Sequence, residues 1–116
     1  MNLEGLLNQV KTSPQSIEFA DVMAVIDAVY DFEPTGFTNG DTRNEAGENN
    51  GSCKIFGFAR LQNLSEPQTL ALFGDYYRSD VLKHLNGSDH QNIRNFMKQG
   101  WEGVLFDANP LTEKEA

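Results

Sequence analysis

Residues 52–63 have the sequence SCKIFGFARLQN, in which apolar side chains leave only a narrow polar edge. Lys54 and Arg60 are the only charged residues in it. A helix that is apolar around most of its circumference is buried on most of its surface. Ser52 precedes the apolar run and belongs to the preferred N-cap residues. We therefore expect a helix over residues 53–63 at the centre of the fold.

The segments on both sides of this helix also show helical periodicity. Residues 2–12 carry leucines and a valine at helical spacing, and residues 16–31 carry a wide apolar stripe opposite three aspartates. Further along, a capping box opens a helix expected over residues 66–85. A similar pattern opens a helix at Ser88 that Gly100 stops. The chain thus predicts about five helices.

Two short strands are expected among the helices. Residues 33–51 are rich in glycine and asparagine, and residues 36–38 within them predict a strand, closed by the Asn-Gly turn that follows. Residues 104–106 form a short apolar run that suits a buried strand and can pair with the first one. The predicted fold class is therefore α+β, dominated by helices, with a small sheet made by parts of residues 34–51 and 102–107.

The length of 116 residues fits one domain, residues 1–116. We expect its core over about residues 3–107 and a frayed tail over residues 108–116. The longest apolar run, residues 22–26, is far shorter than a membrane span of about 20 residues. We expect a soluble monomer.

The negative charge of the chain is unevenly spread. The formal net charge is −8, and residues 1–50 carry nine acids against two bases. Because a negative field repels phosphate backbones and anionic lipid, we expect neither nucleic acid nor membrane as a partner. The acidic half is either a solvated surface or a docking face for a basic partner, and the sequence leaves both interpretations open.

Cys53 is the single cysteine, and the expected helix start places it in the first turn. The positive end of the helix dipole and the neighbouring Lys54 would favour a thiolate nucleophile there. Such a nucleophile needs a base, for which the chain offers His84 and His90. The alternative is a buried, inert thiol. Asp80 and His84 lie one turn apart but match no specific metal pattern, so we expect no metal and no cofactor.

Polar side chains from three parts of the chain can line one ligand pocket. The candidates are Thr38, Asn39, Asn50, Ser52, Cys53, His90, Asn92 and Arg94. Each of them can donate or accept a hydrogen bond. The same residue types also satisfy loop backbone groups and cap helices, so this second interpretation stays open. The sequence assigns no catalytic residue.

Short stretches spread over the chain form a recognisable pattern: 17–19, 24–27, 30–32, 37–40, 50–56, 68–70, 73–78, 89–97 and 100–101. Together they resemble the HopJ type III effector protein family over about residues 3–107. The resemblance implies a bacterial cytoplasmic protein and a candidate for delivery through a type III secretion system. It brings no reaction, cofactor or catalytic residue. Residues 2–12 predict a helix where a type III leader is disordered, so we expect no separate leader.

Three hypotheses about function remain. The first is a non-catalytic, effector-like protein that binds a host or cellular protein. The alternative is a small ligand-binding protein or enzyme, whose pocket combines the Asn/Gly-rich segment with Cys53 and His90. The third is an oligomer building block that assembles through the acidic helix over residues 16–31.

Overall fold

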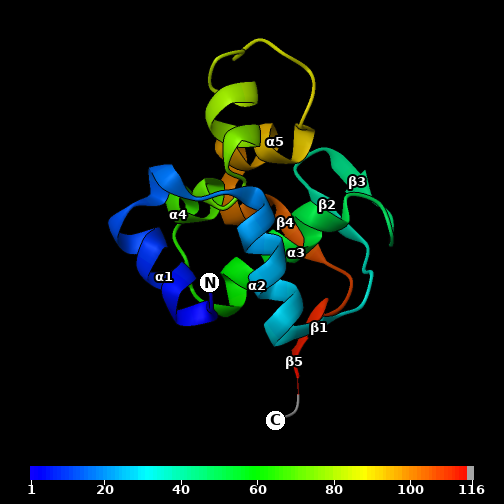
Figure 1. Ribbon diagram of the computed structural model, residues 1–116. Coiled ribbons are helices and arrows are strands. Elements are labelled where there is room, and N and C mark those ends of the chain that lie inside the picture. The colour runs from blue at the N-terminus through cyan, green and yellow to red at the C-terminus, as the bar shows by residue number, and fades with distance from the viewer. Residues whose placement is uncertain (115–116) are drawn as a thin grey trace.

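The computed structural model describes residues 1–114 and consists largely of helices (Figure 1). The α-helices in that part of the chain are α1 (Leu3–Thr12), α2 (Phe19–Val29), α3 (Asn50–Leu61), α4 (Glu66–Ala71) and α5 (Gln91–Gln99). Shorter helical segments are η1 (Pro14–Ser16), η2 (Tyr76–Val81) and η3 (Gly100–Gly103). The strands are β1 (Tyr30–Phe32), β2 (Phe37–Asn39), β3 (Thr42–Asn44), β4 (Val104–Phe106) and β5 (Leu111–Glu113). These elements confirm the predicted α+β class.

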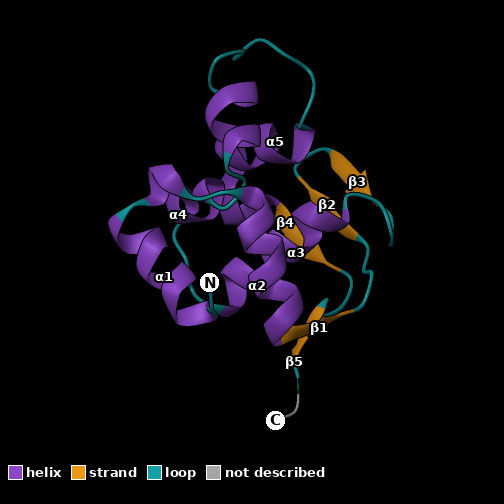
Figure 2. Cartoon of the chain, in the orientation of Figure 1, coloured by secondary structure: helices purple, strands orange, loops and turns teal. Residues whose placement is uncertain are grey.

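The strands form two small antiparallel sheets, drawn in orange in Figure 2. In the larger sheet β2 lies between β3 and β4, with Phe37 opposite Phe106 and Asn39 opposite Val104. This register confirms the pairing that the sequence predicts between its two expected strands. In the smaller sheet β1 pairs with β5, a partner that the sequence analysis missed.

α3 lies in the centre of the hydrophobic core, as its narrow polar edge predicts. Phe56, in the middle of this helix, has no exposed surface. The centroid of its ring lies 6.1 Å from that of Phe37, 5.6 Å from that of Phe73 and 5.0 Å from that of Phe96. One side chain of α3 thus contacts the larger sheet, the segment after α4, and α5.

α3 begins earlier than predicted. Its N-cap is Asn49, which has a positive φ of 51°, and Ser52 lies inside the first turn. Cys53 already donates its backbone N–H to the Asn49 carbonyl at 3.0 Å, so it is not one of the free amides at the helix start. Asparagine enters the left-handed region more readily than most residues. It can therefore end a loop and begin a helix without the side-chain cap predicted for Ser52.

Gly74 interrupts the helix predicted over residues 66–85. α4 opens with the predicted capping box of Ser65 and Gln68, but it is only six residues long. Gly74 has a φ of +61°, and a Cβ at this position would lie 2.9 Å from the backbone nitrogen of Phe19. Two segments pack here too closely for any side chain, so the chain turns and continues as the π-helical η2.

α2 is shorter than the helix predicted over residues 16–31, because Tyr30 already begins β1. It buries Val22 and Ile26 and exposes Asp21 and Asp27, as its periodicity predicts. Within residues 1–114, no helix combines the length and the hydropathy of a membrane span.

The segment before Lys114 is packed, whereas the sequence predicts a frayed tail over residues 108–116. Pro110 and Leu111 are buried, and Leu111 pairs with Phe32 of β1. The prediction is wrong for these residues because β5 completes the open edge of β1, a long-range contact that local composition does not signal. The core accordingly extends to Leu111. Residues 115–116 of the predicted tail lie outside the described residues.

Candidate functional site

The Asn/Gly-rich segment is folded against the start of α5 through a group of buried amides. Asn39 and Asn44, on β2 and β3, are 0% and 1% exposed, and Asn92 on α5 is 6% exposed. Asn39 Nδ2 donates to the Asn92 carbonyl at 2.8 Å, and Asn92 Nδ2 donates to Asn44 Oδ1 at 3.0 Å. Asn49 Nδ2 donates to that same Asn44 oxygen at 2.7 Å. The segment is thus an integral part of the domain.

A polar cavity of about 310 Å³ lies beside these amides, and we call it the amide cavity. It is lined by Thr42, Asn49, Ser52, His90, Gln91, Asn92 and Ile93. Two helices begin at its wall, because Asn49 is the N-cap of α3 and His90 is the N-cap of α5. Neither N-cap side chain caps its helix, so both starts keep backbone N–H groups that favour hydrogen-bond acceptors and anions.

His90 connects the amide cavity to η2. Its Nε2 lies 3.0 Å from Asp80 Oδ2, and its ring centroid lies 5.2 Å from that of Tyr76. The predicted capping box at Ser88 is not formed, because α5 begins after His90, which has a φ of 50°. The His90 side chain is therefore held by Asp80 and Tyr76, and its backbone begins α5 at the cavity wall.

Cys53 does not take part in the amide cavity. It is 1% exposed, and its Sγ donates to the Thr35 carbonyl at 3.6 Å. Burial raises the pKa of the thiol to about 11. Lys54, expected to favour the thiolate, instead forms an ion pair with Asp27 at 2.8 Å. The interpretation of Cys53 as a nucleophile is wrong, and the alternative of a buried thiol holds because α3 turns this residue into the core.

The predicted pocket residues are thus only partly brought together. Ser52, His90 and Asn92 line the amide cavity, and Asn39 is buried against Asn92. Thr38 lies apart from them, within 3.5 Å of the Arg43 guanidinium, and Asn50 is exposed. Arg94 lines a different hollow, together with Gln91, which lines both.

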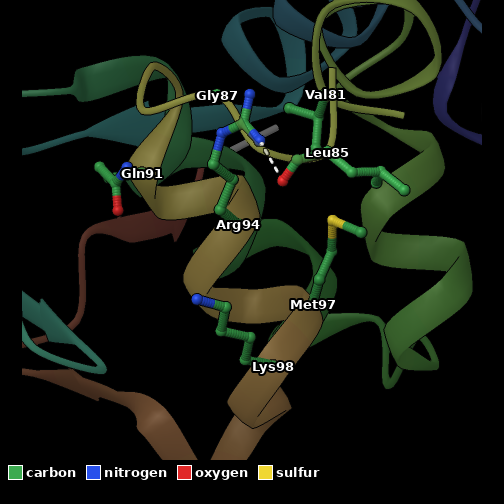
Figure 3. Close-up of a pocket in the computed structure, with 7 residues that line it drawn as sticks. All are labelled: Val81, Leu85, Gly87, Gln91, Arg94, Met97 and Lys98. Carbon is green, nitrogen blue, oxygen red and sulfur yellow. Dashed lines mark hydrogen bonds between the residues drawn. The ribbon is translucent and has the colours of Figure 1, made fainter. Parts of the chain in front are cut away.

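This second hollow has a volume of about 260 Å³ and lies between α5 and the segment after η2 (Figure 3). We call it the Leu85 groove, and it is lined by Val81, Leu85, Gly87, Gln91, Arg94, Met97 and Lys98. Val81 is buried, whereas Leu85 is 67% and Met97 39% exposed. The sequence analysis missed this site and singled out only Arg94 among the residues that line it. The available signal was Leu85 itself, a large apolar residue beside the Asn-Gly turn at 86–87.

Arg94 fixes the rim of the Leu85 groove. It is buried, and its Nη1 donates to the His84 carbonyl at 2.9 Å and to the Leu85 carbonyl at 3.4 Å. Its Nη2 donates to Asp89 Oδ1 at 2.6 Å, and this bond lowers the pKa of the Asp89 carboxyl. One side chain therefore holds residues 84–89 against α5, which gives the groove a defined shape.

Groups of three or more histidine, cysteine, aspartate or glutamate side chains that could hold a metal ion do not occur within residues 1–114. The polar side chains of the two hollows are three amides, two hydroxyls, a histidine, a lysine and an arginine. What this arrangement offers is hydrogen bonding in the amide cavity and apolar contact in the Leu85 groove.

Comparison with known proteins gives a family and a close structural relative. Residues 3–111 match the family model described as HopJ type III effector protein. A solved structure described as "unknown function protein VPA0580" is 55% identical and superimposes with a TM-score of 0.96, covering 98% of this chain and 95% of that one. No curated protein matches. The relative of unknown function brings no activity with it.

Proposed function

The chain belongs to the HopJ type III effector protein family, and from that premise we propose that it acts by binding a protein partner, without catalysing a reaction. The family description suggests a protein delivered through type III secretion. The observation that carries the proposal is the exposure of Leu85, 67%, at the mouth of the Leu85 groove.

Two exposed apolar side chains line this groove. Leu85 and Met97 are 67% and 39% exposed. Exposed apolar surface at a hollow is typical of protein interaction sites, and methionine adapts its shape to a bound surface. The rim is preformed because Arg94 holds it, so binding need not order the segment first.

The buried state of Cys53 supports binding over catalysis. The enzyme hypothesis depended on a thiolate and a nearby base, and a thiol with a pKa of about 11 is almost entirely protonated near neutral pH. His90, the base considered for it, faces Asp80 and Tyr76 instead. The polar side chains that line the amide cavity can donate or accept hydrogen bonds, which suits binding.

The test compares two surface leucines with equal exposure. Leu85 and Leu105 are both 67% exposed, and Leu105 lies on β4, outside the Leu85 groove. Wild type, Leu85→Asp and Leu105→Asp are used to capture proteins from a host-cell lysate, and each captured protein is purified and its affinity measured. We expect at least one partner whose Kd rises more than about tenfold with Leu85→Asp and stays within about twofold with Leu105→Asp. Partners that respond equally to both variants would rule out this groove as the binding site.

A second candidate function is the binding of a small anion in the amide cavity. It is favoured by the two helix starts at one cavity wall, whose backbone N–H groups are not capped by side chains. Titration of the protein with inorganic phosphate at millimolar concentration should shift the amide resonances of Gly51 and Gln91 while those of α1 stay fixed. Shifts of the same size throughout the protein would reject this candidate.

A further inference from the structure

We propose that the Leu85 groove recognises a short acidic segment of the partner, which inserts one large apolar side chain beside Leu85 and Met97 and places a carboxylate near Lys98. This inference rests on the proposed function and specifies the chemistry of the partner. It combines three features of the groove: its size, its charge and the arrangement of its side chains.

The size of the groove suits a single side chain. Its volume of about 260 Å³ is below the range of about 300–1,000 Å³ that is usual for pockets that enclose drug-sized ligands. Val81, 1% exposed, is its apolar floor, and Leu85 and Met97 stand at its edges. One leucine or phenylalanine side chain inserted here would contact Val81 and would cover the exposed parts of Leu85 and Met97.

The charge of the groove is opposite to that of the protein as a whole. The charged residues that line it are Arg94 and Lys98, whereas the chain has a net charge of −8. Arg94 is already paired with Asp89. Lys98 forms no ion pair with any residue between 1 and 114. The groove therefore presents an uncompensated positive charge next to an apolar site.

The acidic remainder of the surface adds selectivity for this site. An acidic segment is repelled by most of the protein, above all by residues 1–50, and is attracted only where positive charge is uncompensated. Complementary charge mainly orients the encounter and discriminates among partners, while the apolar contact supplies most of the affinity. Partner segments without acids would lose that orientation.

The arrangement in Figure 3 indicates where the acid must stand in the segment. Val81, Leu85 and Met97 face a common space, while Lys98 extends along the other flank of α5 with Arg94 between the two. A carboxylate that reaches Lys98 must therefore flank the inserted side chain on a neighbouring residue. The inferred ligand has an apolar residue with aspartate or glutamate directly beside it.

Fluorescein-labelled peptides test this inference directly. The acidic probe is Asp-Asp-Phe-Asp-Asp, its isosteric neutral form is Asn-Asn-Phe-Asn-Asn, and the form without an anchor is Asp-Asp-Ser-Asp-Asp. Fluorescence anisotropy is measured with wild type, Lys98→Glu and Lys11→Glu, a control that makes the same charge change on the exposed surface of α1. We expect the acidic probe to bind wild type about fivefold more tightly than the neutral form. Lys98→Glu should abolish this preference, and Lys11→Glu should change it less than about twofold.

The outcomes separate this inference from the proposed function. Equal binding of the acidic and neutral probes, equal effects of the two lysine variants, or no binding of any probe would overturn the acidic specificity. The proposed function is judged independently, by the Leu85→Asp and Leu105→Asp capture. A wild-type dimer in light scattering that becomes monomeric with Leu85→Asp would show that a second copy occupies the groove, and this would also overturn the inference.

Discussion

The two hollows that share Gln91 are opposite in character. Beside the amide cavity, the buried side chains of Asn39, Asn44 and Asn92 bond one another and hold β2, β3 and α5 together. The Leu85 groove exposes apolar side chains that contribute little to the fold and is kept in shape by Arg94. Surface that is dispensable for stability is the surface available for a partner.

The largest expected change in stability follows from a substitution in the group of buried amides beside the amide cavity. Asn92→Leu should lower the free energy of unfolding by about 3 kcal/mol, because the buried amides of Asn39 and Asn44 lose the hydrogen bonds they form with the Asn92 side chain. Urea denaturation with an unchanged m-value measures the loss. Asn8→Leu, on the exposed face of α1, is the control and should stay within about 0.5 kcal/mol. Equal losses of unfolding free energy in both variants would contradict a stabilising role of the buried amides.

Alkylation of Cys53 tests whether the core around the start of α3 is closed. Because burial raises the pKa of the thiol to about 11, iodoacetamide at pH 8 should react about a hundredfold more slowly with the folded protein than with the protein in urea. Rates are followed by intact mass. Similar rates in the two states would mean that this part of the domain opens readily.

The next prediction concerns Arg94, which supports the rim of the Leu85 groove, in contrast to Lys98 on the same helix. Arg94→Met should lower the free energy of unfolding by about 2 kcal/mol and speed amide exchange in residues 84–89, because their carbonyls lose a common donor. Lys98→Met removes the same charge one turn later and should change neither quantity appreciably. Exchange that stays slow in Arg94→Met would show that something else holds the rim.

The Asp89–Arg94 pair predicts a smaller effect of pH. The pKa of Asp89 is lower in the folded than in the unfolded protein, so the pair stabilises the rim above the ordinary pKa of about 3.9. That stabilisation is lost as the pH falls through the lowered pKa. Carboxyl chemical shifts should titrate below the ordinary value in wild type and near it in Arg94→Met. An ordinary midpoint in wild type would contradict the pair.

The smallest effect is expected for Leu85→Ser. The side chain is 67% exposed, so the free energy of unfolding should change by less than about 0.5 kcal/mol. Chemical denaturation measures it beside Leu105→Ser. A loss comparable to that of Asn92→Leu would show that Leu85 is a core residue, and would remove the contrast between the two hollows.

Local signals predicted much of the fold. The narrow polar edge of residues 52–63 placed α3 in the core, and the capping box at Ser65 and Gln68 is formed. The pairing of β2 with β4 was predicted because only two short segments suited a strand. In each case the signal for the helix or strand itself lies within a few residues, and its local propensity agrees with the tertiary structure.

The errors arise where distant segments decide the local structure. Gly74 ends a periodic helix because Phe19 packs against its backbone, and Leu111 is ordered by β1, far away in the chain. At the candidate site, the sequence identified Ser52, His90 and Asn92 but could not show that Cys53 turns inward. The groove escaped prediction because Met97 follows the apolar period of α5 and yet is left 39% exposed.

The order of the strands also has a consequence for the synthesis of this protein. β4 and β5 are the last strands, yet each is paired with a strand from the first third of the chain. During synthesis from the N-terminal side the β2–β3 hairpin can form early, but both sheets stay incomplete until β4 and β5 have been made. Completion of each sheet therefore depends on pairing between segments far apart in the chain, which is the slow kind of contact to form.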